Sequence, residues 1–277
     1  MSGTLYLVPT PIGNLGDISK RMADTLALAD FIAAEDTRVT LRLLNHLGLK
    51  KPMTPYHRHN LDTAGPAILA RIQGGESCAL VTDAGTPAIS DPGEELAALC
   101  AGAGVTVCAI PGPCALSTAL SASGLPTARF TFEGFLPQNK KNRGARLDAL
   151  RGEERTMVFY EAPHKLAATL AQLADALGAD RRAVLCRELT KLHEEILRAP
   201  LGELAELFCS REPRGEFVLV VEGAPPAPEE PAGERDALER VKQLREQGLG
   251  LKQACARAAG ELGWGRRELY QLALKSE

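Results

Sequence analysis

Residues 82–93, Thr-Asp-Ala-Gly-Thr-Pro-Ala-Ile-Ser-Asp-Pro-Gly, form the segment of this chain best suited to hold a ligand. They follow an apolar stretch, residues 78–82, that predicts a buried strand. Open α/β sheets bind ligands at the carboxyl ends of their strands, and glycine lets bare backbone approach a ligand closely. An ordinary turn-rich loop contains the same residue types, so this segment alone leaves both interpretations open.

Two further loops of the same kind favour a cleft. Residues 110–113, Ile-Pro-Gly-Pro, follow the next predicted strand, and residues 9–14, Pro-Thr-Pro-Ile-Gly-Asn, follow the first strand of the chain. Parallel strands end at one edge of a sheet, so the three loops predict a ligand cleft at that edge. The phosphate-binding pattern G-x-x-x-x-G-K-[ST] does not occur, and no spacing of cysteine and histidine predicts a metal site.

Carboxylates are predicted at strand ends that face this cleft. Glu35 and Asp36 follow one predicted strand, and Glu161 follows another. Asp36 and Glu161 are the candidates for a general base or an orienting group, and the His57-Arg58-His59 loop is a further source of such groups. The competing interpretation, which is the more common one, makes each carboxylate a helix cap or an ion-pair partner.

Residues 138–146 carry Lys140, Lys141, Arg143 and Arg146 and no acidic residue. Nucleic-acid binding requires such local positive charge, because the phosphates supply most of the affinity. The run follows a predicted strand at 130–135, so we expect a phosphate-binding loop near the cleft. The alternative is a solvated surface loop, and the net charge of −3 does not decide between the two.

Strand and helix patterns alternate along residues 1–124, which predicts an α/β domain with a parallel sheet covered on both faces. The predicted strands are 4–8, 31–34, 78–82 and 105–110, and the predicted helices are 19–29, one that ends near 47, 64–72, 94–101 and 114–123. Asp91 precedes Pro92 at the start of the helix 94–101, where an aspartate is typical of a helix cap.

Residues 125–223 predict a second α/β domain. Its strands are 130–135, 156–160, 182–188, 194–198 and 217–221, and its helices are 143–150, 165–177 and 201–208. The strands 182–188 and 194–198 are nearly contiguous, so they predict a hairpin and therefore a mixed sheet. Residues 224–234 are a proline-rich, acidic linker. Residues 235–277 predict a small helical domain, either a helix-turn-helix at 251–262 and 266–274 or a helical hairpin that only packs.

The chain has 277 residues and seven cysteines, an odd number without a C-x-x-C pair. This usage indicates reduced thiols and a cytoplasmic protein. The stretch between Glu95 and Arg129 has no charged residue, but prolines and glycines interrupt it, so no membrane-spanning helix is expected.

Six segments, in order along the chain, resemble motifs of the ribosomal RNA small-subunit methyltransferase I family, a branch of the tetrapyrrole-methylase superfamily. They are LVPTPIGNLGDIS (7–19), AAEDTR (33–38), VTDAGTPAISDPG (81–93), IPGPCALSTAL (110–120), FYEAPHKL (159–166) and CRELTKLHEE (186–195). The resemblance covers residue 4 to about 223. It implies the two-domain tetrapyrrole-methylase fold with S-adenosylmethionine in the cleft and 2′-O-methylation of a cytidine in small-subunit (16S) ribosomal RNA. It also implies a homodimer that acts on an assembled or late-stage small subunit.

In the superfamily, a Gly-Asp-Pro loop contacts the cofactor. The matching residues here are Gly85-Thr86-Pro87, so a threonine replaces the aspartate, as in the ribosomal RNA branch. The resemblance places nine residues at the cofactor: Asp83, Gly85, Thr86, Ile89, Ala115, Leu116, Tyr160, Glu216 and Phe217. The candidates for RNA contact are Arg38, His57, His59, Lys140, Lys141, Arg143 and Arg146.

Two competing functions remain at this level. A methyltransferase of the same fold that acts on a corrin precursor would retain Gly-Asp-Pro and would need no basic run. A non-catalytic protein that binds RNA or DNA through the tail helices would need no cofactor cleft. The motifs at 33–38 and 81–93, together with the basic run and the tail, favour the RNA methyltransferase.

Overall fold

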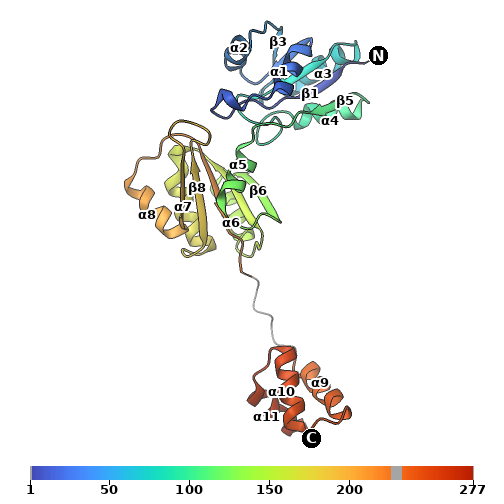
Figure 1. Ribbon diagram of the computed structural model, residues 1–277, viewed down its shortest axis with the longest axis vertical. Helices are drawn as coiled ribbons and strands as arrows, with labels where there is room; N and C mark the ends of the chain where they lie inside the picture. The colour runs from blue at the N-terminus through green and yellow to red at the C-terminus, as the bar shows by residue number, and fades with distance from the viewer. Residues whose placement is uncertain (1, 226–232, 277) are drawn as a thin grey trace. The chain divides into compact units, whose positions relative to one another are not determined.

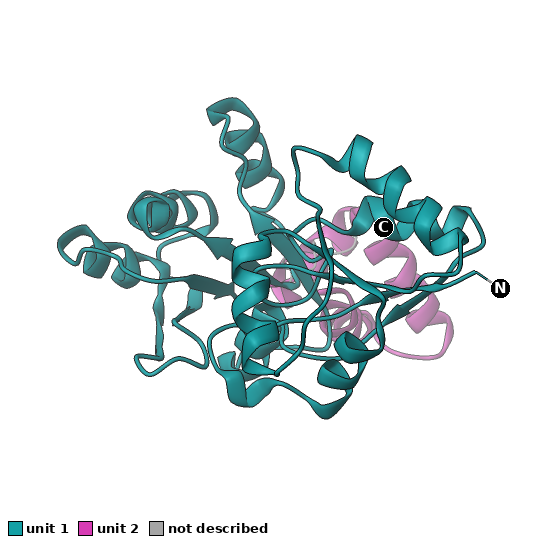
Figure 2. Ribbon diagram, turned by 90° about the horizontal axis from the view of Figure 1, so that it is seen from above, with its two compact units in different colours: residues 1–224 teal, residues 225–277 magenta. Residues whose placement is uncertain are grey.

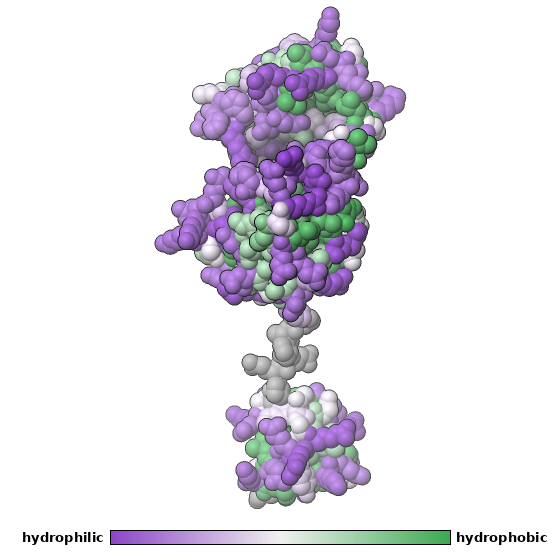
Figure 3. Space-filling view, turned by 90° about the vertical axis from the view of Figure 1, so that its left-hand side faces the viewer, coloured by the Kyte–Doolittle hydropathy of each residue, from purple (hydrophilic) through white to green (hydrophobic). Residues whose placement is uncertain are grey.

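The computed structural model describes residues 2–225 and 233–276, and the chain divides into two compact units, residues 1–224 and 225–277 (Figure 2). The larger unit contains two five-stranded sheets, and the smaller unit is helical. On the face shown in Figure 3, hydrophilic side chains predominate on the larger unit and hydrophobic ones gather in smaller patches. No helix within the described ranges is long and apolar enough to cross a membrane.

The first sheet is entirely parallel, as predicted, with the order β3-β2-β4-β1-β5 (Figure 1). Its strands are β1 (Thr4–Leu7), β2 (Phe31–Ala34), β3 (Met53–Pro55), β4 (Cys78–Val81) and β5 (Thr106–Ala109). The helical elements are η1 (Leu15–Asp17), α1 (Lys20–Leu28), α2 (Thr37–His46), α3 (Leu61–Gln73), α4 (Glu94–Gly102) and α5 (Ala115–Ser123). Separate apolar cores cover the two faces, one around Phe31 and Leu80 and the other around Ile32 and Val81. The sequence did not indicate β3, because three residues ending in proline carry no alternating pattern.

The second sheet is mixed, as predicted, with the order β6-β7-β10-β8-β9. Its strands are β6 (Phe130–Phe135), β7 (Thr156–Glu161), β8 (Arg182–Arg187), β9 (Glu195–Pro200) and β10 (Phe217–Val221). Strands β6 and β7 are parallel, and β8 and β9 form the expected antiparallel hairpin. The helices are α6 (Lys140–Ala149), α7 (Pro163–Leu177) and α8 (Leu201–Ser210), and a core of leucines joins this sheet to all three.

Helix α5 connects the two sheets. Ala119 and Leu120 on α5 pack against Val158, Val184 and Val218, which project from three strands of the second sheet. Figure 1 shows this helix, in green, beside β6 and β8. The packing holds the carboxyl edge of the first sheet next to the second sheet.

Two local predictions are wrong. The basic run is not a loop, because α6 begins at Lys140, where the side chain of Asn139 accepts hydrogen bonds from the backbone N–H of Lys141 (3.0 Å) and Asn142 (3.1 Å). Asp91 does not cap α4, which instead begins after Gly93, a residue with φ of 146° and no capping side chain. The helix predicted at 143–150 therefore begins three residues earlier, at Lys140, whereas α4 begins at Glu94 as predicted and only its cap was assigned wrongly.

The smaller unit consists of α9 (Glu234–Glu246), α10 (Leu251–Leu262) and α11 (Arg266–Ser276) around one apolar core. Gly263 ends α10 in the left-handed conformation, with φ of 72°, so the chain reverses and α11 packs against α9 and α10. The predicted linker, 224–234, coincides largely with residues 226–232, which lie outside the described residues. The seven cysteines are free thiols, and four of them are buried.

The cap at Asn139 gives a direct test of how the basic run is folded. We expect Asn139→Ala to lower the free energy of unfolding by about 1 kcal/mol, because two backbone N–H groups of α6 lose their acceptor. Asn139→Asp, which keeps the acceptor oxygen, is the control and should retain most of the stability. Denaturant unfolding together with hydrogen exchange at residues 141–143 measures both variants, and unchanged exchange in Asn139→Ala would contradict the assignment.

Candidate active site

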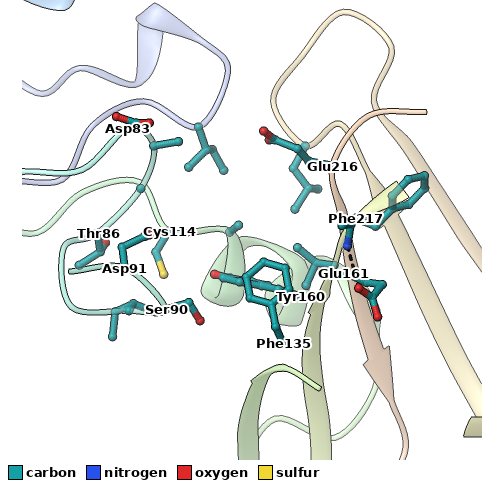
Figure 4. Close-up of a pocket in the computed structure, with 18 of the residues that line it drawn as sticks. Asp83, Thr86, Ser90, Asp91, Cys114, Phe135, Tyr160, Glu161, Glu216 and Phe217 are labelled. Atoms are coloured by element: carbon teal, nitrogen blue, oxygen red, sulfur yellow. Dashed lines mark hydrogen bonds between the residues drawn. The ribbon is translucent and has the colours of Figure 1, made fainter. Parts of the chain in front are cut away.

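A cavity of about 400 Å³ lies between the carboxyl edge of the first sheet and the adjoining edge of the second (Figure 4). The loops after β1, β2, β4 and β5 form one wall, and the ends of β6, β7 and β10 form the other. Its lining residues are Ile12, Glu35, Asp83, Ala84, Gly85, Thr86, Ile89, Ser90, Asp91, Cys114, Ala115, Phe135, Tyr160, Glu161, Ala162, Pro163, Leu189, Glu216, Phe217 and Val218. The three glycine- and proline-containing loops therefore meet at one site.

The resemblance assigned nine residues to the cofactor, and eight of them line this cavity: Asp83, Gly85, Thr86, Ile89, Ala115, Tyr160, Glu216 and Phe217. The ninth, Leu116, is not in the lining. Its backbone N–H donates a 2.9 Å hydrogen bond to the Tyr160 hydroxyl, which ties the first turn of α5 to β7. Burial raises the pKa of Tyr160, so this hydroxyl remains protonated and holds its ring across the cavity.

Hydrogen bonds connect the loops of the first wall. Gly85 exchanges two backbone hydrogen bonds with Thr10, at 2.9 and 3.0 Å, and the Thr86 hydroxyl donates to the Pro113 carbonyl at 2.9 Å. Gly85 has φ of 84°, whereas a Cβ added there would meet Ile12 at an ordinary 3.5 Å. The backbone conformation, and not lack of space, therefore requires glycine at this position.

Three carboxylates on the first wall are partly buried, and burial is the main reason that their pKa values are raised. Asp83 raises the pKa of Glu35 further, and Asp36 does the same for Asp83. Burial, with the negative charge of Glu35, raises the pKa of Asp91 to about 6. Sequence reasoning missed Asp91 as a site residue because Asp-Pro before a helix indicated a cap. Only its position in the folded loop places it in the cavity.

The oxygens of both predicted catalytic carboxylates already accept hydrogen bonds in this structure. Asp36 lies outside the cavity lining, and its hydrogen bonds to Arg38 lower its pKa to about 2. Glu161 lines the cavity but is only 6% exposed. Its oxygens accept hydrogen bonds from the Thr169 hydroxyl (2.5 Å) and the Ala162 N–H (2.9 Å). Both carboxylates therefore act as structural acceptors in this geometry.

The predicted RNA-contact residues divide into two groups. Arg143 points into the protein, where it donates to Gln172 and Thr169 and lies 3.8 Å from Glu161, so it is a structural residue. Arg146 pairs with Glu133, and Arg38 pairs with Asp36. Lys140 and Lys141 are exposed and have no ion-pair partner among the described residues.

In the loop after β3, Arg58 and not the two histidines is hydrogen-bonded to the turn that lines the cavity. Arg58 donates a 2.5 Å hydrogen bond to the Ser90 carbonyl and so supports the turn that carries Asp91. Ala88 and Ser90 in this turn have φ of 68° and 66°, a conformation that is unfavourable for residues other than glycine. His57 is half-buried, and His59 is exposed. Among the described residues, no group of three His, Cys, Asp or Glu side chains could hold a metal ion.

Comparisons with known proteins agree with this architecture. Residues 4–205 match the family model described as Tetrapyrrole (Corrin/Porphyrin) Methylases, and residues 231–277 match one described as RsmI C-terminal HTH domain. The chain is 47% identical over 275 residues to the ribosomal RNA small subunit methyltransferase I of Synechocystis sp., covering 99% of both chains. It is also 47% identical over 279 residues to the protein of the same name from Pseudomonas aeruginosa, covering 100% of this chain and 98% of that one.

One solved structure shows the same fold with a ligand bound. It is the uroporphyrin-III C-methyltransferase of Thermus thermophilus in complex with S-adenosyl homocysteine, with a TM-score of 0.55 and 19% identity. The match covers 79% of this chain and 97% of that one. At this identity the likeness concerns the fold alone.

The raised pKa of Asp91 has a measurable cost in stability. The folded protein binds this proton more tightly than the unfolded chain, so stability is lost as pH rises from about 4 through 6. We expect Asp91→Asn to raise the free energy of unfolding of the ligand-free protein at pH 8 by on the order of 1–2 kcal/mol, after allowance for partial exposure. The gain should shrink toward zero near pH 4.

Asp36→Asn is the matched control, because it should change the free energy of unfolding at pH 8 in the opposite direction. Its folded pKa is lowered, so the charge stabilises the protein above pH 4, and its removal should destabilise the protein at pH 8. Thermal unfolding of the wild type and both variants at pH 4, 6 and 8 measures the two effects. If Asp91→Asn were less stable than the wild type at pH 8, burial would not be the dominant influence on this carboxyl.

Proposed function

Because this chain belongs to the ribosomal RNA small subunit methyltransferase I family, we propose that it transfers a methyl group from S-adenosylmethionine to a ribose 2′-hydroxyl of a cytidine in small-subunit (16S) ribosomal RNA. The observation that carries the proposal is the cavity itself. It is built from the family's motif loops, and the relatives at 47% identity extend over nearly the whole chain.

The residues of the cavity fit S-adenosylmethionine. The volume of about 400 Å³ lies in the range of small-molecule sites, and the lining combines bare backbone at 83–86 with aromatic and aliphatic side chains. This cofactor carries a positive charge, and the carboxylates of Asp83 and Asp91 supply negative charge on one wall. When bound, it supplies a methyl group that its sulfonium has already activated.

The chain's own contribution is to position the ribose and to accept its proton. We assign that role to Glu35, which lines the cavity beside Asp83 and whose pKa is raised by burial. A raised pKa makes a carboxylate a stronger base, and a ribose hydroxyl is a poor nucleophile without a proton acceptor. Asp36, with its pKa near 2, and Glu161, with its oxygens already bonded, are weaker candidates.

For the RNA we assign phosphate contacts to Lys140 and Lys141, whose ammonium groups are exposed at the first turn of α6, and to His59 on the loop after β3. The family resemblance further supports a cytoplasmic homodimer that acts on an assembled or late-stage small subunit. Light scattering of the purified protein and methyl transfer to whole subunits compared with naked RNA test these two points.

The first expected outcome concerns the product. Mass-spectrometric mapping of ribosomal RNA from cells with and without this protein should show one ribose methyl that depends on it. A deoxy target nucleotide should accept no methyl group, because the nucleophile has been removed. Methylation of the deoxy substrate would place the modification on the base and would contradict the proposal.

Lys140→Gln/Lys141→Gln should weaken RNA binding and flatten its salt dependence by about one log-log unit per lost phosphate contact. Each single variant, Lys140→Gln or Lys141→Gln, has Lys20→Gln as its charge-matched control, which removes one exposed lysine paired with Asp24 on α1.

The next expected outcome separates proton acceptance from cofactor binding. Glu35→Gln should lower kcat by roughly 10²-fold or more and leave the affinity for S-adenosylmethionine nearly unchanged. Asp91→Asn should weaken that affinity about tenfold at pH 8, through loss of a partly buried charge. Wild-type affinity should fall as pH drops through 6, whereas that of Asp91→Asn should not.

Calorimetric titrations at pH 5, 6 and 8 and single-turnover methyl transfer supply these data. Equal loss of cofactor affinity in both variants would contradict the division of roles between Glu35 and Asp91.

A further inference from the structure

We propose that Phe135 is the platform on which the base of the target nucleotide stacks during methyl transfer. The inference rests on the proposed function and adds to it the residue that holds the substrate base. Phe135 ends β6 and lines the cavity, yet 54% of its surface is exposed to solvent. Figure 4 shows its ring next to Tyr160.

A local irregularity of β6 directs this ring into the cavity. In a regular strand, residues three positions apart point to opposite faces. Phe132 and Phe135 nevertheless both contact Tyr160 edge-on, with ring centroids at 5.0 and 5.7 Å. The pairing of β6 with β7 shifts register between Phe132 and Gly134, which is a bulge, and Gly134 has φ of 58°. Bulges next to active sites are known to re-aim a side chain in this way.

The bulge is tightly constrained. A Cβ on Gly134 would lie 3.2 Å from the Ser90 hydroxyl oxygen, so β6 approaches the Ser90–Asp91 turn of the opposite wall closely. The Tyr160 ring that supports Phe135 is itself held by the Leu116 N–H. Phe135 therefore projects from a fixed support and remains largely exposed to solvent.

The exposure of Phe135 indicates which ligand it contacts. Phe217 also lines the cavity, from β10, but its ring packs against Phe208 in the core of the second sheet, and the residue is only 3% exposed. A small cofactor is expected to be enclosed by the cavity, whereas a nucleotide that belongs to a large RNA must enter from solvent, where an exposed ring meets it first. Exposed aromatic rings stack on unpaired bases, and Lys140 and Lys141, five and six residues further along the chain, provide charge for the adjoining phosphates.

The test begins with substitutions that keep or remove the aromatic face. Phe135→Leu should lower kcat/KM for the small subunit roughly 5- to 150-fold, the range expected for one lost stacking contact. Phe135→Trp should retain activity. Phe130→Leu is the matched control, because Phe130 lies on the same strand, is 42% exposed and does not line the cavity. Affinity for S-adenosylmethionine, measured by calorimetry, should be unchanged in all three variants.

The decisive measurement combines Phe135→Leu with small subunits reconstituted with an abasic target nucleotide, which keeps the ribose 2′-hydroxyl. If the ring stacks on the base, the wild type should lose activity on the abasic substrate, and Phe135→Leu should lose little more. If the substitution and the missing base each lowered activity independently, so that their fold-losses multiplied, the proposal would be overturned. A loss of cofactor affinity in Phe135→Leu would also overturn it, because the ring would then be assigned to the cofactor instead.

These outcomes are distinct from failure of the proposed function. In that case the wild type would not methylate the ribose of the unmodified subunit at all. If the wild type methylates the ribose but the losses from Phe135→Leu and from the abasic nucleotide multiply, only the role of Phe135 is overturned.

Discussion

The packing of α5 against the second sheet is the contact on which the site depends. Ala119 and Leu120 are buried against valines of β7, β8 and β10, and the Leu116 N–H donates to the Tyr160 hydroxyl at the start of the same helix. The loop that precedes α5 belongs to the first wall of the cavity, and the strands beneath α5 supply the second wall. One helix therefore sets the spacing of two walls that otherwise belong to separate sheets.

The cavity holds three partly buried carboxylates close together, which is unfavourable for the stability of the free protein. Glu35, Asp83 and Asp91 all have raised pKa values because burial disfavours their ionised forms. Such an arrangement costs stability in the free protein, and it is typical of sites that receive a cation. Arg58 offsets part of the cost, since its positive charge lowers the pKa of both Glu35 and Asp91 and its guanidinium donates to the Ser90 carbonyl.

The run at 138–146 leaves only part of its positive charge available to RNA. Of the four basic residues in the run at 138–146, Arg143 is used to hold Thr169 and Gln172, and Arg146 is used to hold Glu133. Two lysines remain exposed, in a chain with a net charge of −3. Within this run only Lys140 and Lys141 are therefore available to phosphates, and the proposed contact of a base with the exposed ring of Phe135 would not depend on charge.

The sequence by itself determined the two sheets, their strand types, most of their helices and the loops that meet at the cavity. These features follow from local periodicity and from glycine and proline at strand ends, and family motifs identified eight of the lining residues. The inward turn of Arg143, the bonding of Glu161 to Thr169, and the places of Asp91 and Phe135 were decided only by the tertiary structure. Each depends on a partner distant in sequence or on a bulge and a left-handed turn that leave no periodic pattern, so local residue types alone did not contain the information.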